Sequence, residues 1–553
     1  MNEKGQGREE ARNFMSGVLL LSLSTVIVKV VGLAFKIPML SILGTEGMGY
    51  FNSAYEIYAM LCVLSTAGLP VALSMLISSA RVRGRAREIR RIYRASKLIF
   101  ALIGAIGSLA MLIFARPLAT AIGNDNAYDC IVAIAPALIP VCLAGAIRGY
   151  CQGFEYMTPT AISQLMEALG KLIFGVGLAS FATARGYTSE KVAAFAVAGI
   201  GVGSVFSLLY LVLAKLTHRN KLTCRTLDAE QSVDGKNAVT ELLRIALPIT
   251  LSSAVTSVSR IIDMALIMRR LQDTGVSMEE SNMIYGAYTT LAIPVFSLVP
   301  ALITPLSMAI VPRLSAFRAK QDDVGEATVQ NDSLRITVIF ALPASLGLAA
   351  FAEPILSLLF PNQQAAIDIS APLLSILGGS VLFSCMITTT NAILQSYRHV
   401  CLPIISMSIG VIIKFIVTYV LVGVSGVGAL GAPIGSLACN IFVTALNLFF
   451  MSRFANSRPK SSELLFKPLA ASVLAVGTAF VFYVFSYSII KSEALHFAIT
   501  LMIALIVYIP ASFAFGNITK NDLSLFLTKK RAVQLCTQRK INKKTDYTNI
   551  RRR

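Results

Sequence analysis

Basic side chains stand inside long apolar segments of this chain. Lys29 and Lys36 lie seven residues apart within one apolar run, so they share a face of the helix predicted there. Lys171, Arg260 and Lys414 fall near the middle of three later apolar runs. A cation at membrane depth is costly, and it usually faces a wet cavity or an anionic ligand. Ammonium and guanidinium groups suit phosphate well, so the pattern predicts a site for a phosphate-bearing anion.

Acidic residues near these cations are fewer and allow two interpretations. Glu167 lies four residues before Lys171, and Asp263 lies three residues after Arg260, so both could form ion pairs within one helix. Glu56 is a candidate partner from a different helix. The predicted diphosphate-binding residues are Lys29, Lys36, Arg260 and Lys414, and the predicted charge partners or coupling residues are Glu56, Glu167, Lys171 and Asp263. For Lys36, the alternative is that it reaches the outer headgroups.

The composition is that of a polytopic membrane protein. Hydrophobic residues make up 55% of 553 positions, charged residues make up 14%, and the mean hydropathy is +0.70. The net charge of +20 comes from short loops and tails between apolar runs, as the positive-inside rule expects, so no nucleic-acid partner is predicted. Nine scattered cysteines and three histidines indicate no zinc site, and no cofactor is predicted.

Apolar runs of at least about 18 residues predict an all-α fold with fourteen transmembrane helices. The predicted ranges are 14–42, 48–77, 98–115, 128–150, 160–183, 191–214, 242–268, 284–311, 336–352, 366–393, 402–424, 430–452, 467–489 and 494–514. The first two helices are joined by a predicted tight turn from Gly44 to Gly49. Lys and Arg gather on one side of this topology, which predicts that both termini are cytoplasmic.

The first six predicted helices recur as the next six. Glutamine precedes proline by seven residues at Gln152–Pro159 and by eight at Gln395–Pro403. The same register then reaches Lys171 after twelve residues and Lys414 after eleven. Likewise, Thr25 stands four residues before Lys29, as Thr256 does before Arg260. An even number of helices per repeat relates the copies by an axis along the membrane normal, with a site in the cleft between them.

The repeat predicts the domain organisation. It comprises an N-terminal lobe at 1–215, a cytoplasmic linker at 216–241, a C-terminal lobe at 242–452, two extra helices at 453–514 and a basic cytoplasmic tail at 515–553. The extra helices could offer an apolar groove to a lipid tail, or they could shield the second lobe from lipid.

Four motifs resemble a known family: GLAFKIP at 32–38, LGTEGMGY at 43–50, AYEIY at 54–58 and STAGLPVALS at 65–74. They look like the opening of the polysaccharide biosynthesis and sporulation stage V protein B family. That family is related to MurJ-type lipid II flippases within the multidrug/oligosaccharidyl-lipid/polysaccharide exporter superfamily. The resemblance covers nearly the whole chain. It implies basic residues on the first helix that face a central cavity, and Lys29 and Lys36 match those positions.

The function that the resemblance implies is a flippase in the bacterial cell membrane. Its substrate would be an undecaprenyl-diphosphate-linked oligosaccharide, similar to lipid II, carried from the inner to the outer leaflet by alternating access for peptidoglycan synthesis. No P-loop is present, so sodium, protons or the membrane potential would drive transport rather than ATP. Two alternatives stay open, namely a multidrug or cation antiporter of the same superfamily and a non-transporting scaffold for cell-wall or spore assembly.

Overall fold

The computed structural model describes residues 3–218, 235–319, 321–397, 399, 401–424, 426–454, 465–486 and 492–517. Every regular element among these residues is helical, which confirms the predicted all-α class. The predicted linker 216–241 falls mostly outside the described residues. The predicted basic tail 515–553 lies outside them after residue 517.

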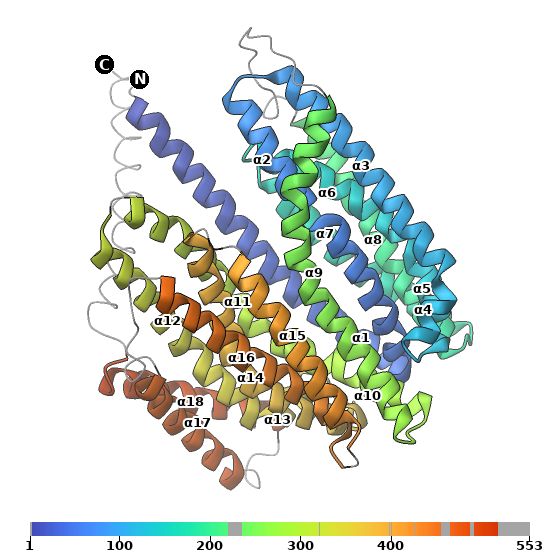
Figure 1. Ribbon diagram of the computed structural model, residues 1–553. Coiled ribbons are helices and arrows are strands. Elements are labelled where there is room, and N and C mark those ends of the chain that lie inside the picture. The colour runs from blue at the N-terminus through green and yellow to red at the C-terminus, as the bar shows by residue number, and fades with distance from the viewer. Residues whose placement is uncertain are drawn as a thin grey trace, which may run out of the picture.

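The N-terminal half comprises the elements up to α8, and Figure 1 shows α2 to α8 together at the upper right. These are α1 (Glu3–Thr66), α2 (Leu69–Val82), α3 (Ala86–Ile113), α4 (Ala115–Ala121), η1 (Asp125–Ala127), α5 (Tyr128–Ile134), η2 (Ala135–Ala137), α6 (Leu138–Gly153), α7 (Thr158–Ala184) and α8 (Ser189–Thr217). Helix α3 begins twelve residues before its predicted start, because residues 86–97, between the second and third predicted helices, are themselves helical.

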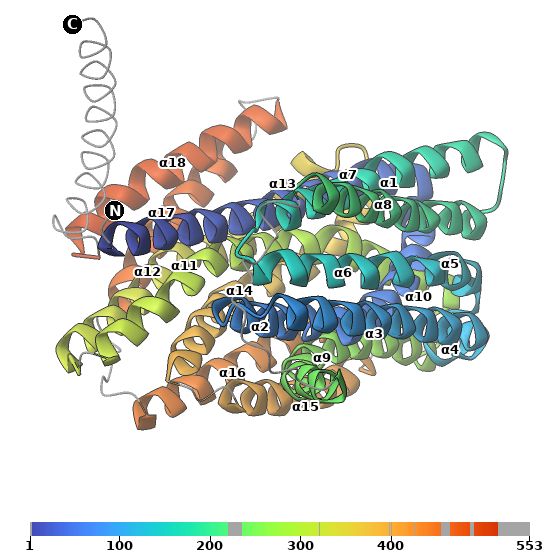
Figure 2. The same ribbon diagram turned by 90° about the horizontal axis from the view of Figure 1, so that it is seen from above.

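The C-terminal half follows from residue 235. It contains α9 (Gly235–Asp273), α10 (Met278–Ala287), the π-helix η4 (Tyr288–Ala292), α11 (Ile293–Ala319), α12 (Asp323–Ala350), α13 (Ala352–Leu359), α14 (Gln364–Ser396), α15 (Cys401–Val422), η5 (Gly428–Leu430) and α16 (Gly431–Phe454). Two further helices, α17 (Lys467–Ser486) and α18 (Glu493–Ala514), pack on one another. Figure 2 shows them at the edge of the molecule, where α17 contacts α12.

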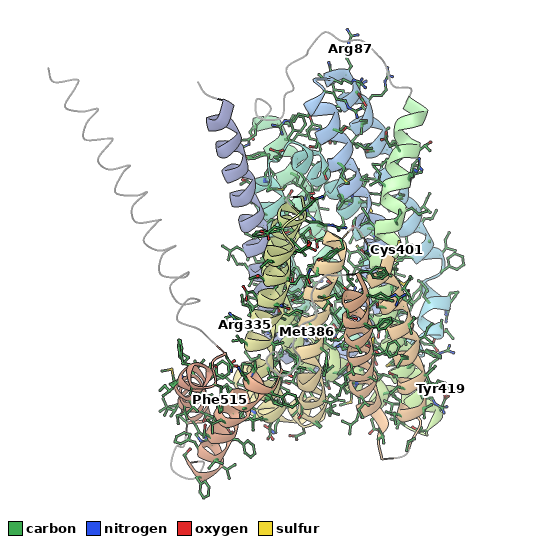
Figure 3. All side chains as sticks on the ribbon, turned by 60° about the vertical axis from the view of Figure 1, so that its left-hand side comes forward. Arg87, Arg335, Met386, Cys401, Tyr419 and Phe515 are labelled. Atoms are coloured by element: carbon green, nitrogen blue, oxygen red, sulfur yellow. The ribbon has the colours of Figure 1, made fainter. Side chains whose placement is uncertain are left out.

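Helix α1 reverses direction at Gly44. This residue has φ 65° and ψ −178°, a conformation that only glycine adopts readily, whereas residues 45–49 are helical. The predicted turn is therefore a break at one residue. The chain returns along α1 and α2 to the end of the bundle that carries Arg87 and the start of α1, and Tyr419 lies near the opposite end (Figures 1 and 3).

Thirteen stretches of the described residues are long and apolar enough to cross a membrane. The first, Leu23–Arg81, has 59 residues, which at about 1.5 Å per residue is far longer than one crossing of a bilayer core. It contains the break at Gly44 and covers the first two predicted helices. The fold is thus that of a multi-pass membrane protein, while the count of fourteen and the orientation of the termini stay predictions.

The two halves repeat one pattern of helix contacts. In the N-terminal half, α6 contacts α2, α3 and α8, and α7 contacts α1 and α8. In the C-terminal half, α14 contacts α11, α12 and α16, and α15 contacts α9 and α16. This arrangement agrees with the repeat in the sequence, although the exact lobe boundaries stay predictions.

Candidate anion-binding site

A cavity of about 510 Å³ lies between α1, α6, α7 and α8 of the N-terminal half and α11 of the C-terminal half. Its lining includes four basic residues, Lys29, Lys36, Arg148 and Lys171, and one acidic residue, Glu167. The volume lies within the roughly 300–1,000 Å³ typical of ligand pockets. Because cations outnumber carboxylates, the cavity is suited to an anion.

Lys36 on α1 forms a hydrogen bond to the C-terminal half, where the π-helix η4 interrupts the α-helical hydrogen-bond pattern. The Ile293 N–H donates to the Tyr288 carbonyl in the π-helix, one residue further back than in an α-helix. Pro294 has no N–H to donate to the next carbonyl, that of Thr289. The Lys36 ammonium donates to this oxygen at 2.5 Å. Lys36 therefore points inward from α1, and the prediction that it reaches the outer headgroups is wrong.

Lys171 is held by aromatic rings. Its Nζ lies 4.3 Å from the ring centre of Tyr55, 4.8 Å from that of Phe35 and 5.8 Å from that of Phe51. Such contacts stabilise a cation without neutralising it. No carboxylate oxygen of a described residue lies within 4 Å of Lys171, so the predicted same-helix ion pair of Lys171 with Glu167 is absent. The positive charge of Lys171 faces the cavity.

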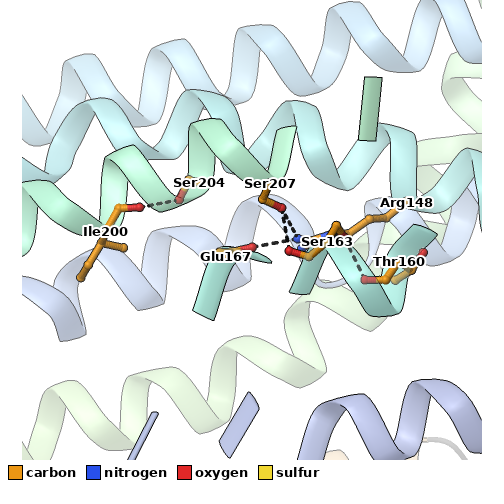
Figure 4. Close-up of polar contacts among 7 residues, drawn as sticks. All are labelled: Arg148, Thr160, Ser163, Glu167, Ile200, Ser204 and Ser207. Carbon is orange, nitrogen blue, oxygen red and sulfur yellow. Dashed lines mark hydrogen bonds and ion pairs between the residues drawn. The ribbon is translucent and has the colours of Figure 1, made fainter. Parts of the chain in front are cut away.

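Glu167 pairs instead with Arg148 on α6. The Arg148 Nη2 lies 2.8 Å from Glu167 Oε2 and 3.0 Å from Ser207 Oγ, and its Nε donates to Ser163 Oγ at 2.9 Å (Figure 4). Three helices thereby fix one guanidinium group at the wall of the cavity. Arg148 was not predicted as a site residue, since it lies two residues from the end of its predicted helix, where a basic residue is ordinary.

Arg260 and Glu56 form an ion pair between the two halves. Arg260 Nε on α9 lies 3.6 Å from Glu56 Oε2 on the returning part of α1. Glu56, a candidate partner for the membrane cations in the sequence, thus pairs with Arg260, whereas the predicted pair of Arg260 with Asp263 is absent among the described ion pairs. Neither Arg260 nor Glu56 lines the cavity itself, but Tyr55, which precedes Glu56 in the chain, does. The pair therefore stands beside the cavity and can respond to its charge.

Lys414 and Asp263 are buried together in the C-terminal half. The Lys414 ammonium lies 2.6 Å from Asp263 Oδ2 and donates to Ser259 Oγ at 3.0 Å. Neither charged residue lines the cavity. Lys414, which was predicted to bind diphosphate, thus lies in an internal ion pair. This pair was not predicted from the sequence.

Breaking this buried pair is expected to destabilise the protein. Lys414→Met should lower the free energy of unfolding by about 3–5 kcal/mol, because it leaves the Asp263 carboxylate buried and unpaired. Thermal unfolding of the purified protein in detergent measures the effect. Lys414→Met combined with Asp263→Leu should recover most of the stability, since no charge is then buried. Equal melting temperatures for wild type and the single variant would contradict this energetic role.

The two halves are joined by hydrogen bonds at the end opposite the N-terminus. Asn282 on α10 donates to the Glu46 carbonyl at 2.8 Å and accepts from Asn124 Nδ2 at 2.8 Å. Nearby, Asn52 donates to Thr290 Oγ1 at 2.9 Å. A Cβ on Gly49 would come within 2.5 Å of Asn282, so glycine is required for this close approach. We call the contacts of Asn282, Asn124, Asn52 and Thr290 the polar seal.

Comparisons with known proteins agree with this architecture. The sequence matches the polysaccharide biosynthesis protein family over residues 14–318 and the MatE family over residues 248–420. Among curated relatives from Bacillus subtilis (strain 168), the uncharacterized membrane protein YabM is 26% identical, covering 78% of this chain and 79% of the relative. Stage V sporulation protein B is 25% identical, covering 80% and 84%. Lipid II flippase MurJ is 22% identical, covering 74% and 77%.

Solved structures show the same fold. The inward closed conformation of the lipid II flippase MurJ superposes with a TM-score of 0.70 at 14% identity, covering 90% of this chain and 98% of that chain. An inward-facing multidrug resistance MATE family transporter of the MOP superfamily superposes with a TM-score of 0.63 at 14% identity, covering 77% and 97%. The predicted location in the bacterial cell membrane agrees with these relatives. The chain is a multi-pass membrane protein with the fold of MOP-superfamily transporters, and it belongs to the polysaccharide biosynthesis protein family.

Proposed function

We propose that this protein is a flippase for an undecaprenyl-diphosphate-linked oligosaccharide, similar to the peptidoglycan precursor lipid II. It carries this lipid from the inner to the outer leaflet of the cytoplasmic membrane. The observation that supports the proposal most strongly is the cavity with four basic residues and one acidic residue. A diphosphate is compact and highly charged, and lysine and arginine bind it through charge-assisted hydrogen bonds.

The charge of the cavity argues against the main alternative within the superfamily. A carrier of cationic drugs needs unpaired carboxylates at membrane depth. Here the cavity carboxylate, Glu167, is paired with Arg148, and the nearby Glu56 is paired with Arg260. A cation entering this site would meet Lys29, Lys36 and Lys171 without a free acidic partner among the described residues. An anionic substrate therefore fits better than a cationic one.

The contacts between the halves support a mechanism of alternating access. The polar seal joins the halves at the end opposite the N-terminus, and the ion pair of Arg260 with Glu56 joins them beside the cavity. A diphosphate bound near these cations competes with Glu56 for Arg260 and so weakens a contact that joins the halves. We propose that the lobes 1–215 and 242–452 then rock about the site, with the helices of 453–514 beside the prenyl tail. Any net charge moved couples transport to the membrane potential, at about 2.3 kcal/mol per charge per 100 mV.

Complementation of a bacterial strain depleted of its lipid II flippase tests this function. The wild-type protein should restore growth, whereas Lys29→Gln combined with Lys36→Gln should not. Losing two charge-assisted contacts of about 1.5–3 kcal/mol each weakens headgroup binding by about 100-fold or more. The readout is colony formation at equal membrane levels of each variant.

Charge-conserving variants provide the control. Lys29→Arg combined with Lys36→Arg should restore growth, because guanidinium groups also bind phosphate. A well-expressed wild-type protein that fails to restore growth would argue against a lipid II-like substrate. Growth with the double glutamine variant would show that these lysines do not form the site and would favour a non-transporting role.

A further inference from the structure

The internal repeat relates two lysines that have different surroundings. Lys171 on α7 and Lys414 on α15 follow the matching glutamine-to-proline turns. In each half, a glycine of the next helix packs against the residue four positions after the lysine. Gly199 lies against Gly175 in the N-terminal half, and Gly435 lies against Thr418 in the C-terminal half. The two lysines therefore occupy equivalent places.

The helix that faces each lysine shows the difference between the halves. Helix α7 contacts α1, and α15 contacts α9. The matching threonines, Thr25 and Thr256, align these facing helices with an offset of 231 residues. In this alignment, Gly32 is the counterpart of Asp263. The carboxylate that neutralises one lysine is thus missing beside the other.

Gly32 leaves an open space at the corresponding point of the cavity. It lines the cavity together with Lys29 and Lys171, and a Cβ built on it would meet no atom within 4 Å. In the C-terminal half, the equivalent volume is filled by the Asp263 side chain, whose Oδ2 lies 2.6 Å from the Lys414 Nζ. The lysine of the C-terminal half, Lys414, thus has a protein carboxylate beside it, whereas the lysine of the N-terminal half, Lys171, has none at the corresponding position.

We propose that the space over Gly32 is the binding position for an anionic group of the substrate, which meets Lys171 as Asp263 meets Lys414. This inference rests on the proposed function and adds a location for the phosphate. Lys171 and Lys29 approach the anion from α7 and α1, respectively. A side chain longer than a methyl group at this position would occupy the position of the phosphate.

The substitution Gly32→Asp tests this binding position. It places a carboxylate where the C-terminal half has one, so it should pair with Lys171 and exclude the external anion. We expect the affinity for inorganic pyrophosphate, measured by calorimetry on the protein in phosphatidylcholine nanodiscs, to fall about 30-fold. Lys171→Gln added to Gly32→Asp should cause little further loss, because both changes remove the same interaction.

Two control variants separate the binding position from general effects. Ser297→Asp adds the same charge to the cavity lining on α11 and should weaken pyrophosphate binding by only about threefold, since a partly solvated charge at a distance interacts weakly. Gly32→Ala should bind nearly as well as wild type, because a methyl group meets no neighbour. Equal losses for both aspartate variants, or unchanged affinity with Gly32→Asp, would overturn the proposal.

The proposed function and the binding position can fail separately. If wild type restores growth of the flippase-depleted strain and Gly32→Asp does so equally well, the binding position is wrong and the function stands. If wild type does not restore growth but binds pyrophosphate, and Gly32→Asp weakens this binding far more than Ser297→Asp does, the anion position stands and the lipid substrate is wrong.

Discussion

Arg148→Gln is expected to weaken the binding of inorganic pyrophosphate roughly 30-fold, more than the loss of one cavity charge would suggest. Arg148 has two roles at the wall of the cavity. It contributes a positive charge, and it holds the Glu167 carboxylate at 2.8 Å. Glu167 stands four residues before Lys171 on α7 and lies within electrostatic range of it. Without Arg148, Glu167 can turn to Lys171 and neutralise it, since residues four apart face each other on a helix.

A second substitution distinguishes this mechanism from simple loss of charge. Glu167→Gln added to Arg148→Gln removes the carboxylate that would neutralise Lys171. The double variant should therefore bind pyrophosphate within about threefold of wild type, which is a strong departure from additivity between neighbouring residues. Glu167→Gln alone should bind at least as tightly as wild type, because it leaves four cavity cations without a carboxylate.

Calorimetry on the protein in nanodiscs measures all four proteins of this cycle, and thermal unfolding shows that each is folded. The control is Arg148→Lys, which keeps the charge but loses the geometry of the guanidinium group, so its affinity should lie between those of wild type and Arg148→Gln. A double variant that binds as weakly as Arg148→Gln would show that Glu167 does not compete for Lys171.

The positions of the cations could be predicted from the sequence, and most of their partners could not. A charge inside a long apolar run is visible in a sequence, so Lys29, Lys36 and Lys171 were all identified, and all three line the cavity. Ion pairs within one helix were the natural expectation for Glu167 and Asp263. Both carboxylates pair with a different helix instead, because the geometry of helix packing decides which groups meet.

The repeat in the sequence was detectable, but its chemical meaning was not. Lys171 and Lys414 could be aligned from the glutamine-to-proline turns alone. That alignment suggests similar roles for the two lysines, and the structure shows different ones. The deciding position is Gly32, where the absence of a side chain gives no signal in a hydropathy pattern. Only the contact of α7 with α1 shows what a carboxylate at that position would neutralise.

Glycine and proline mark backbone irregularities in the sequence, but the consequences of these irregularities are not visible there. Gly44 marks the reversal of α1, and Pro294 lies in a membrane segment where a proline breaks the pattern of hydrogen bonds. The sequence does not reveal that Pro294 leaves the Thr289 carbonyl available to Lys36. Such a bond depends on the register between α1 and η4, and Lys36 and Thr289 lie 253 residues apart in the sequence.

Removing Asn282 from the polar seal should open the end of the protein opposite the N-terminus. Asn282→Ala loses two hydrogen bonds between the halves, the donation to Glu46 and the acceptance from Asn124. A net contribution of about 0.5–1.5 kcal/mol per bond shifts the balance between the closed and open states by about tenfold. The Asn124 amide retains its bond to Ser53 at 3.2 Å, so the N-terminal half stays ordered.

Double electron–electron resonance between spin labels measures this opening. The exposed positions Lys191, at the start of α8, and Val424, after α15, can carry labels as Lys191→Cys and Val424→Cys once the nine native cysteines are replaced. The population with the longer distance should rise about tenfold in Asn282→Ala. Ser277→Ala is the matched control, since it removes the N-cap bond to Glu280 of the same helix without touching the seal. Equal distance distributions in Asn282→Ala and Ser277→Ala would show that the seal does not hold the halves together, and the closure would then rest on the glycine contacts of α1 with α10.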